Sequence, residues 1–519
     1  MDAITEPAAA ERDKSPVIRL HAEDGVVIAR VALPPGTPVA PNVVARARIP
    51  AGHKVAVRGH APDEPIRRYG QIIGFATGAI APGEWVHTHN CAMGEFSRDY
   101  AWGVDARPTD YVAQPAEFMG IRRADGRVAT RNYIGIITSV NCSAHVADLV
   151  ARSFTRNPFV DGPDPLADTP MVDGVVALTH KTGCGMTEGE PLRVLRRVLA
   201  GFARHPNFSH VIAIGLGCEV NQLGGLLEEQ RLAGRLRTLT IQDEGGTRRT
   251  VERGIGFVRE VLAEANAVTR VPVPASELKV ALQCGGSDGY SGISANPALG
   301  AASDLVVRHG GTVILAESPE TYGAEHLLTR RAVSPEVGQR LVDVMKWWED
   351  YTAREGAEMN ANPSPGNKAG GLTTILEKSL GAMAKAGTTN LTEVVRYAEA
   401  VTARGFAFMD TPGYDPVGAT GQVAGGANLM CFTTGRGSVF GCKPAPSIKL
   451  ATNSAMFARM EEDMDVDCGT VLSGSETVEE CGARIFGEML RVASGERTKS
   501  EVMGFGDAEF APWVLGATM

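Results

Sequence analysis

The stretch YIGIITSVNCSAH, residues 133–145, passes from a run typical of a buried strand into a small polar loop that carries a cysteine. Three later stretches repeat the pattern: GVVALTHKTGCGM (174–186), HVIAIGLGCEVN (210–221) and LKVALQCGGSDGYSG (278–292). In open α/β sheets, ligands bind beyond the carboxyl ends of the strands. We therefore expect an active-site wall built from four strand ends and their cysteines, Cys142, Cys184, Cys218 and Cys284.

Helical segments separate these strands. Amphipathic stretches such as EPLRVLRRVLAGFARH (190–205) alternate with the apolar runs, and a further set of strands follows residue 400. This alternation predicts an α/β fold with parallel sheets and crossover helices. We divide this part of the chain into a catalytic α/β domain, 118–330, and a second α/β domain, 331–519, that completes the active site.

The N-terminal part of the chain has a different pattern. Three similar units, LPPGTPV (33–39), IPAGHKV (49–55) and IAPGEWV (80–86), lie among short apolar segments. Pro or Ala before Gly is typical of tight turns between strands. We therefore expect a small all-β domain over 17–95. A disordered tail over 1–16 should precede it, and a linker over 96–117 should follow it.

Composition limits the classes of function. The chain has 519 residues and a net charge of -9, which argues against nucleic acid or an anionic membrane as the main partner. No apolar run reaches the length of a membrane span. The first residues are polar and lack the apolar core of a signal peptide, so we expect a cytoplasmic protein. In that reducing compartment, the nine cysteines should be thiols or ligands and not disulfides.

The sequence HTHN at 87–90 offers two imidazoles. If this stretch is a strand, His87 and His89 point to the same face, which suits a divalent metal or an anionic substrate. Two surface histidines in a loop are the alternative.

The four strand-end cysteines allow three interpretations. They could hold an iron–sulfur cluster, which requires converging thiolates, although the usual CxxC spacing is absent. They could instead lie beside a substrate and take part in acid–base chemistry. Cysteine is also a common small buried residue, so a structural role stays open.

Acid–base candidates stand close to these strand ends. His180 could be a general base because imidazole titrates near neutral pH, or it could be a hydrogen-bonded structural residue. Glu219 and Asp288 follow two of the cysteines. Glu317 and Glu320 follow another strand and could bind metal, act as an acid or belong to the acidic first turn of a helix.

Basic residues cluster in glycine-rich loops, where arginine and lysine can hold carboxylates. Taken together, the predicted substrate-binding residues are Arg131, Asn132, Cys142, Cys218, Cys284, Ser287, Asp288, Asn367, Arg436 and Lys449. Lys368 and Cys184 join the predicted catalytic set of His180, Glu219 and Glu317.

Four long motifs carry a family resemblance: CGGSDGYSGISANPALG (284–300), PETYGAEHLL (319–328), NPSPGNKAGG (362–371) and FTTGRGSVFG (432–441). They resemble the altronate and galactarate dehydratase family. The stretch from 49 to 90 is similar to its N-terminal β-clip domain of the SAF type. HTHN is closer to the altronate branch, whereas CAMGEFSRDYAWG (91–103) and GCKPAP (441–446) depart from both branches.

The resemblance implies a metal-dependent sugar-acid dehydratase, with iron(II) or manganese as the activator. Family positions fall on Cys142, His180, Cys184, Cys218, Glu219, Cys284, Asp288, Glu317, Lys368, Arg436, Lys449 and Asp465.

The expected reaction is the loss of water from a 2,3-dihydroxy carboxylate to give a 2-keto-3-deoxy acid. His87 and His89 would hold the metal as a Lewis acid, and His180 would take the C2 proton. Glu219, Glu317 or a cysteine would protonate the departing hydroxyl. A sulfo-lyase acting on a sulfolactate-like acid and a non-catalytic sugar-acid binding protein are the alternatives. A homodimer is the expected assembly.

Overall fold

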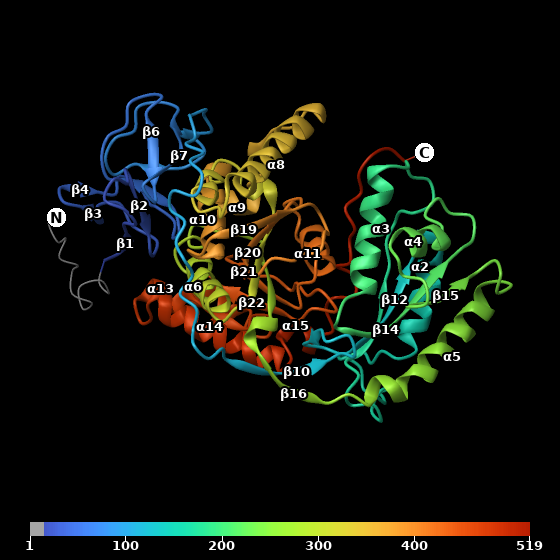
Figure 1. Ribbon diagram of the computed structural model, residues 1–519. Coiled ribbons are helices and arrows are strands. Elements are labelled where there is room, and N and C mark those ends of the chain that lie inside the picture. The colour runs from blue at the N-terminus through green and yellow to red at the C-terminus, as the bar shows by residue number, and fades with distance from the viewer. Residues whose placement is uncertain (1–14, 519) are drawn as a thin grey trace.

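The computed structural model describes residues 15–518, so most of the expected tail over 1–16 lies outside the described residues. Figure 1 shows three bodies side by side: a small β domain drawn in blue, a central α/β body, and a second α/β body drawn mainly in green. The expected α/β fold with an N-terminal β domain is confirmed. No helix among the described residues is long and apolar enough to cross a membrane.

The N-terminal domain consists of short antiparallel strands. One sheet has the order β1-β2-β5-β8, and a second has the order β6-β7-β9. The strands are β1 (Val17–Ile18), β2 (Val26–Ala29), β3 (Pro38–Ala40), β4 (Val43–Val44), β5 (Lys54–Ala56), β6 (Pro65–Arg68), β7 (Gln71–Ala76), β8 (Trp85–Val86) and β9 (Cys91–Ala92).

The three repeated units form the turns predicted for them. In each unit, the residue after the glycine donates its backbone N–H to the carbonyl three positions earlier, as in Thr37 to Pro34 and Glu84 to Ala81. Gly36, Gly52 and Gly83 have φ between 81° and 86°. Only glycine adopts this conformation without strain, which explains its place in each unit.

The segment after the β domain crosses the central body. Its backbone N–H groups at Gly103, Asp105 and Val112 donate to carbonyls of the body, so this linker lies against it. A three-stranded antiparallel sheet follows, with the order β11-β10-β16. Its strands are β10 (Glu117–Arg122), β11 (Val128–Ala129) and β16 (Arg270–Pro274).

A four-stranded parallel sheet forms the core of the second body. It has the order β13-β12-β14-β15 and contains β12 (Tyr133–Thr138), β13 (Gly174–Leu178), β14 (Phe208–Gly215) and β15 (Arg237–Thr240). The helices are α2 (Asn141–Arg152), α3 (Glu190–Ala203), α4 (Leu223–Glu229) and α5 (Thr247–Asn266). Apolar residues of α2 and α5 cover one face, and those of α3 cover the other.

The central body contains a seven-stranded parallel sheet with the order β19-β20-β18-β17-β21-β22-β23. The strands are β17 (Lys279–Cys284), β18 (Thr312–Leu315), β19 (Leu391–Val395), β20 (Gly405–Met409), β21 (Leu429–Thr434), β22 (Ser447–Ala451) and β23 (Val466–Asp467). The predicted domain boundary at residue 330 falls inside this sheet, because β17 pairs with the later strand β21 and β18 pairs with the later strand β20. The chain leaves the four-stranded sheet before α5 and enters the seven-stranded sheet at β17.

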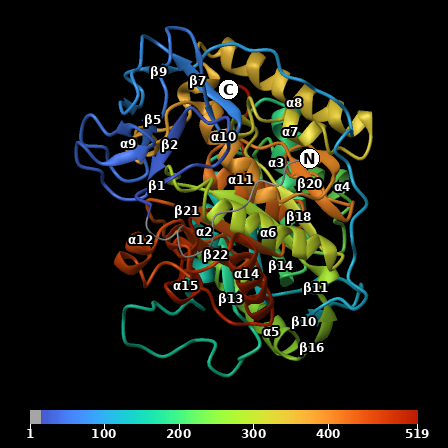
Figure 2. The same ribbon diagram turned by 90° about the vertical axis from the view of Figure 1, so that its left-hand side faces the viewer.

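Helices cover the central sheet on both faces. Figure 2 shows α14 (Val478–Ala493) lying beside α6 (Ala295–Arg308), and the two helices share one apolar core. The other helices are α7 (His326–Thr329), α8 (Pro335–Arg354), α9 (Pro365–Ala369), α10 (Ile375–Met383), α11 (Asp415–Ala424), α12 (Ser454–Arg459), α13 (Gly469–Ser473) and α15 (Lys499–Val502).

The β domain packs on the central body through backbone contacts between glycines. Gly289 and Gly370 are linked within the central body by a backbone hydrogen bond, and a Cβ on Gly289 would lie 2.0 Å from the carbonyl oxygen of Gly52 in the β domain. A Gly289→Ala variant should therefore lose about 1–3 kcal/mol of stability, because backbone would have to move. Urea unfolding measures this loss. Gly224→Ala, where a Cβ meets nothing within 4 Å, is the matched control and should not destabilise the protein.

Candidate active site

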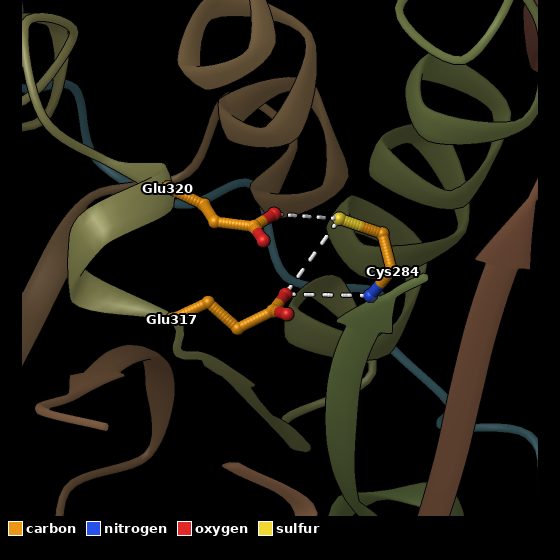
Figure 3. Close-up of side chains that lie close together, drawn as sticks. All are labelled: Cys284, Glu317 and Glu320. Carbon is orange, nitrogen blue, oxygen red and sulfur yellow. Dashed lines mark hydrogen bonds between the residues drawn. The ribbon is translucent and has the colours of Figure 1, made fainter. Parts of the chain in front are cut away.

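A cysteine and two glutamates meet at the carboxyl ends of β17 and β18 (Figure 3). Cys284 ends β17, whereas Glu317 follows β18 and Glu320 lies in the short helix η2 (Ser318–Glu320). Cys284 Sγ lies 3.6 Å from Glu317 Oε2 and 3.5 Å from Glu320 Oε2. All three side chains are buried. Because β17 and β18 are parallel neighbours, their ends bring these residues together.

Two buried lysines complete this cluster. Lys385, in η4 (Ala384–Ala386), places Nζ 2.8 Å from Cys284 Sγ and 3.0 Å from Glu317 Oε2. Lys378, in α10, donates to Glu320 Oε1 at 2.7 Å and to Asn362 Oδ1 at 2.8 Å. Neither lysine is among the site residues predicted from the sequence. The sequence pattern that could have indicated them is a pair of lysines within the apolar stretch ILEKSLGAMAKAG (375–387). The two lysines are seven residues apart, a spacing that places them on the same face of a helix.

The two carboxyl groups of the cluster have different proton affinities. Burial raises the pKa of Glu317 to about 7, although the charge of Lys385 opposes this shift. Burial acts in the same direction on Glu320, but the ammonium of Lys378 outweighs it and lowers the pKa of Glu320. Two neighbouring carboxyl groups with separated pKa values are the usual arrangement for acid–base work at neutral pH.

Glu317 is also unusual in its backbone and its hydrogen bonds. Its φ of 68° and ψ of 63° place it in the left-handed region, which is strained for a residue other than glycine. Glu317 Oε1 is buried and has no hydrogen-bond partner, while Oε2 accepts from Lys385 and from the backbone N–H of Cys284. Strain and an unpaired buried oxygen at one residue are typical of functional sites.

The glycine-rich loop after β17 forms the next wall. A small cavity adjoins the cluster and is lined by residues that include Tyr69, Cys284, Ser287, Asp288, Asn296 and Lys378. Asp288 Oδ2 accepts from Thr452 Oγ1 at 3.0 Å, and Asn367 Nδ2 donates to the carbonyl of Ser287 at 2.9 Å. The predicted residues Ser287, Asp288 and Asn367 thus lie in this region, together with Cys284.

The strand expected to carry the two histidines is not formed, and a metal on His87 and His89 stays a prediction. His87 and His89 lie in a turn and not in a strand, so they do not share a face. His87 Nε2 is 2.9 Å from the carbonyl oxygen of Lys368, and its Nδ1 accepts the backbone N–H of Thr88. Both imidazole nitrogens of His87 are therefore engaged, while His89 is exposed.

His180 and Glu219 have structural contacts. His180 Nε2 lies 2.8 Å from the carbonyl oxygen of Thr138, and its Nδ1 accepts the N–H of Thr182. Burial lowers the pKa of His180 to about 4. The Glu219 carboxylate accepts from Ser139 Oγ and from the backbone N–H groups of Leu216 and Gly217. His180 follows β13 and Glu219 follows β14 in the four-stranded sheet, whereas Glu317 follows β18 in the seven-stranded sheet.

Arg131 and Asn132, predicted to bind substrate, tie structural segments together. The five N–H donors of Arg131 contact Glu501 and the carbonyls of Thr130, Val492 and Glu496. Asn132 Nδ2 donates to the carbonyls of Met171 and Ala265. Because all five guanidinium donors are used, Arg131 has none left for a carboxylate ligand.

The remaining basic residues are spread around the central sheet. Lys449 is buried in β22 with its Nζ 3.4 Å from the carbonyl of Phe440, and its N–H donates to Asp465. Arg436 is exposed, and its backbone N–H bonds to Gly286. Lys368 is half-buried. Only the backbone of Lys368 has a role that the contacts define, as the acceptor for His87.

The four predicted cysteines do not form one wall. Cys142, Cys184 and Cys218 are exposed at the edge of the four-stranded sheet, whereas Cys284 is buried at the end of a strand in the seven-stranded sheet. The repeated sequence pattern is the same, but the strands belong to two sheets.

Three family models match the chain, and their limits follow the observed bodies. They are the altronate/galactarate dehydratase SAF domain over 15–94, the second domain of D-galactarate dehydratase/altronate hydrolase over 120–266, and the C-terminal domain of D-galactarate/altronate dehydratase over 275–518. Galactarate dehydratase (L-threo-forming) of Escherichia coli K12 is 39% identical over 92% of this chain and 93% of its own length. Altronate dehydratase of Bacillus subtilis 168 is 33% identical over 97% and 99%.

The chain belongs to the altronate and galactarate dehydratase family. The expectation of a sugar-acid dehydratase, a carbon–oxygen lyase, is thereby confirmed. Overall identity does not favour the altronate branch, since the galactarate enzyme shares more residues. The beta subunit of (2R)-sulfolactate sulfo-lyase from Chromohalobacter salexigens is 31% identical over 75% of this chain. The cluster of Cys284, Glu317 and the two lysines lies in the C-terminal family domain.

Proposed function

We propose that the protein dehydrates an aldarate or aldonate to a 2-keto-3-deoxy acid, and that Glu317 moves the proton. The observation that carries this assignment is the buried Glu317 beside Lys385, with a pKa of about 7 and one oxygen without a partner. A base with a pKa near the working pH combines a large ionised fraction with useful basicity.

The reaction is an elimination in which each atom is accounted for. Glu317 takes the proton from C2, and the electron pair left on C2 forms the double bond as the 3-hydroxyl departs. Glu317 then returns the same proton to that hydroxyl, so water leaves and the enol becomes the 2-keto acid. The ammonium groups of Lys378 and Lys385 stabilise the negative charge that develops on the substrate carboxylate. In a buried site, such fixed charges act more strongly than in water.

The cluster does not fit a resident divalent metal in this arrangement. Among the described residues, Cys284, Glu317 and Glu320 are a set whose potential ligand atoms all lie within 4.8 Å of one another. The Lys385 ammonium, however, already contacts two of these three side chains. The two lysines also balance the charges of the two glutamates, so an added dication would be an uncompensated buried charge. No step of the proposed elimination uses a metal, and dependence on iron(II) or manganese stays a prediction.

A panel assay tests the reaction. Anaerobically purified protein should form 2-keto-3-deoxy acid from galactarate, altronate or a close relative, measured with and without added iron(II) or manganese(II). Sulfite release from sulfolactate, with no product from any sugar acid, would instead assign the sulfo-lyase activity. Light scattering in the same buffer tests the predicted homodimer. The cytoplasmic location likewise stays a prediction.

The pH dependence of the rate tests the role of Glu317 as a base. Only the ionised carboxylate can accept the C2 proton, and its pKa is about 7. We therefore expect kcat/KM to fall about tenfold per pH unit below pH 7 and to level off above it. A profile that is flat between pH 5 and 7, with the protein folded throughout, would exclude Glu317 as the base.

A further inference from the structure

The three exposed cysteines lie on adjacent strand ends of the four-stranded sheet. Cys142 follows β12, Cys184 follows β13 and Cys218 follows β14, and β12 lies between the other two strands. The other cysteines are buried. Free cysteine is among the most buried residue types, so three exposed thiols on neighbouring loops need an explanation other than packing.

Backbone and side-chain hydrogen bonds hold these loops together. Asn141 donates its N–H to the carbonyl of Thr182, Val220 donates to Cys184, and Asn221 donates to Gly183. The bonds of Glu219 and His180 described above fix the same loops from within. These hydrogen bonds fix the loops that carry the three thiols, so Glu219 and His180 act as positioning residues for them.

Glycines allow the loops to come this close. A Cβ on Gly183 would lie 2.3 Å from the carbonyl oxygen of Ser139, and one on Gly217 would lie 2.4 Å from Gln242 Oε1. Gln242 Nε2 in turn donates to Cys218 Sγ at 3.5 Å. The glycines directly before Cys184 and Cys218 are therefore required by the close packing of the cysteine loops.

Backbone hydrogen bonds hold the start of α2, which carries Cys142, against the loop of Cys184, and they hold the loop of Cys184 against that of Cys218. Cys142 is the second residue of α2, whose first turn has no side-chain cap and no acidic residue, so the end of the helix favours an anion there. Desolvation by the surrounding loops and the neighbouring thiols of Cys184 and Cys218 raise the pKa of Cys142.

We propose that Cys142, Cys184 and Cys218 bind an iron–sulfur cluster. A single ion would need the three sulfurs about 4 Å apart, since metal–thiolate bonds are about 2.3 Å long. The three thiols do not form a set with ligand atoms within 4.8 Å of one another among the described residues, whereas a cluster spans a wider separation. Cys284 is not a ligand in this proposal, because it is buried at the end of a strand in the seven-stranded sheet and accepts a hydrogen bond from Lys385.

Binding requires iron and sulfide from outside the protein. Each of the three thiols releases its proton to solvent as its sulfur forms a bond to one iron, and no electron passes to the protein. With three cysteines and no fourth, one iron of a four-iron cluster would have no protein sulfur as its ligand. The thiolate preference of such clusters matches this all-sulfur site.

Metal and sulfide analysis of the full-length protein tests the proposal. After anaerobic reconstitution with iron and sulfide, the protein should hold iron and acid-labile sulfide in equal amounts and show broad visible absorbance. Cys142→Ser, Cys184→Ser and Cys218→Ser should each lower cluster content at least about tenfold. Cys284→Ser and the buried-thiol control Cys431→Ala should keep the cluster. Because the three cysteines are exposed, their serine variants should fold normally, as circular dichroism would show.

Three results would overturn the proposal. They are no labile sulfide in the reconstituted protein, a cluster retained by the triple serine variant, or bound iron without sulfide. Dehydratase activity is measured on the same samples. A protein that binds the cluster but forms no keto acid counts against the proposed function alone, and a protein that dehydrates sugar acids without a cluster counts against the cluster alone.

Discussion

The Glu317→Gln variant should lose a factor of about 10²–10⁴ in kcat, the usual contribution of a positioned acid–base group. Glutamine has the same shape but cannot accept the C2 proton. The change should leave KM within a few-fold of the original value, because it removes neither Lys378 nor Lys385, the groups that we propose for the substrate carboxylate. Keto acid formation under saturating substrate measures the effect.

A matched variant separates chemistry from the general disturbance of a buried charge. Glu320→Gln alters the other carboxylate of the cluster, whose pKa is lowered mainly through Lys378. This variant should weaken the ion pair with Lys378. Its kcat/KM should still rise with pH up to about 7, because Glu317 is unchanged. If the profile of Glu320→Gln loses this rise and that of Glu317→Gln keeps it, the base is Glu320 and our assignment is wrong.

Much of the fold follows from local sequence patterns. The turn units at 33–39, 49–55 and 80–86 predict the β domain because Pro or Ala before Gly determines a turn within four residues. Alternating apolar runs and amphipathic segments likewise predict parallel sheets. The grouping of strands into sheets depends on long-range pairing, which has no local signal. For this reason the sequence placed Cys284 with the other three cysteines, and the structure separates them.

The candidate site could be predicted only in part, for a similar reason. Cys284 and Glu317 follow strands directly, so their place at a sheet edge is readable from the sequence. Lys378, in α10, pairs with Glu320 across 58 residues of sequence, and Lys385, in η4, pairs with Glu317 across 68 residues, so both pairings are tertiary contacts. The glycine-rich loop around Arg436 predicts a substrate-binding role. Loop composition does not determine the direction of a side chain, however, and Arg436 is exposed in the structure. Arg131 was also predicted to bind substrate, but its guanidinium is buried and pairs with Glu501, so it has a structural role.

The Glu377→Gln variant should lose about 3–5 kcal/mol of stability, the usual loss when one partner of a buried ion pair is removed. Glu377 lies in α10 and accepts hydrogen bonds from Lys54 at 2.8 Å and from Arg68 at 2.6 Å, both from the β domain. All three side chains are almost fully buried. Without the carboxylate, the two cations would keep hydrogen bonds to the carbonyls of Gly371 and Gly289 but would stay buried without a counter-ion. The free energy of unfolding in urea measures the loss.

Glu64→Gln is the control, because Glu64 pairs with Arg58 at the surface and such pairs contribute less than about 1 kcal/mol. A stability change in Glu377→Gln no larger than in this control would show that the buried contact does not hold the β domain in place.

The pH dependence of stability gives an independent check on Glu377. Burial alone would raise its pKa, but Lys54 and Arg68 outweigh this and lower the pKa to about 2, from 4.5. Because the folded-state pKa is the lower one, the stabilisation is present above about pH 4.5 and is lost as pH falls toward 2. Glu377→Gln should lack this acid-sensitive part of the curve.

The location of this contact connects stability with access to the site. Glu377 and Lys378 are neighbours on α10, so one side of the helix holds the β domain and the next residue contacts the Glu320 carboxylate. Tyr69 of the β domain lines the cavity beside Cys284. The side chains of Cys284, Glu317 and Glu320 are buried, so substrate can reach them only if α10 and the β domain move apart. Weakening the Glu377 contact should therefore speed substrate entry while lowering stability, so kcat/KM and the unfolding free energy should change in opposite directions. A variant in which both fall together would show that the β domain must stay docked for the chemistry itself.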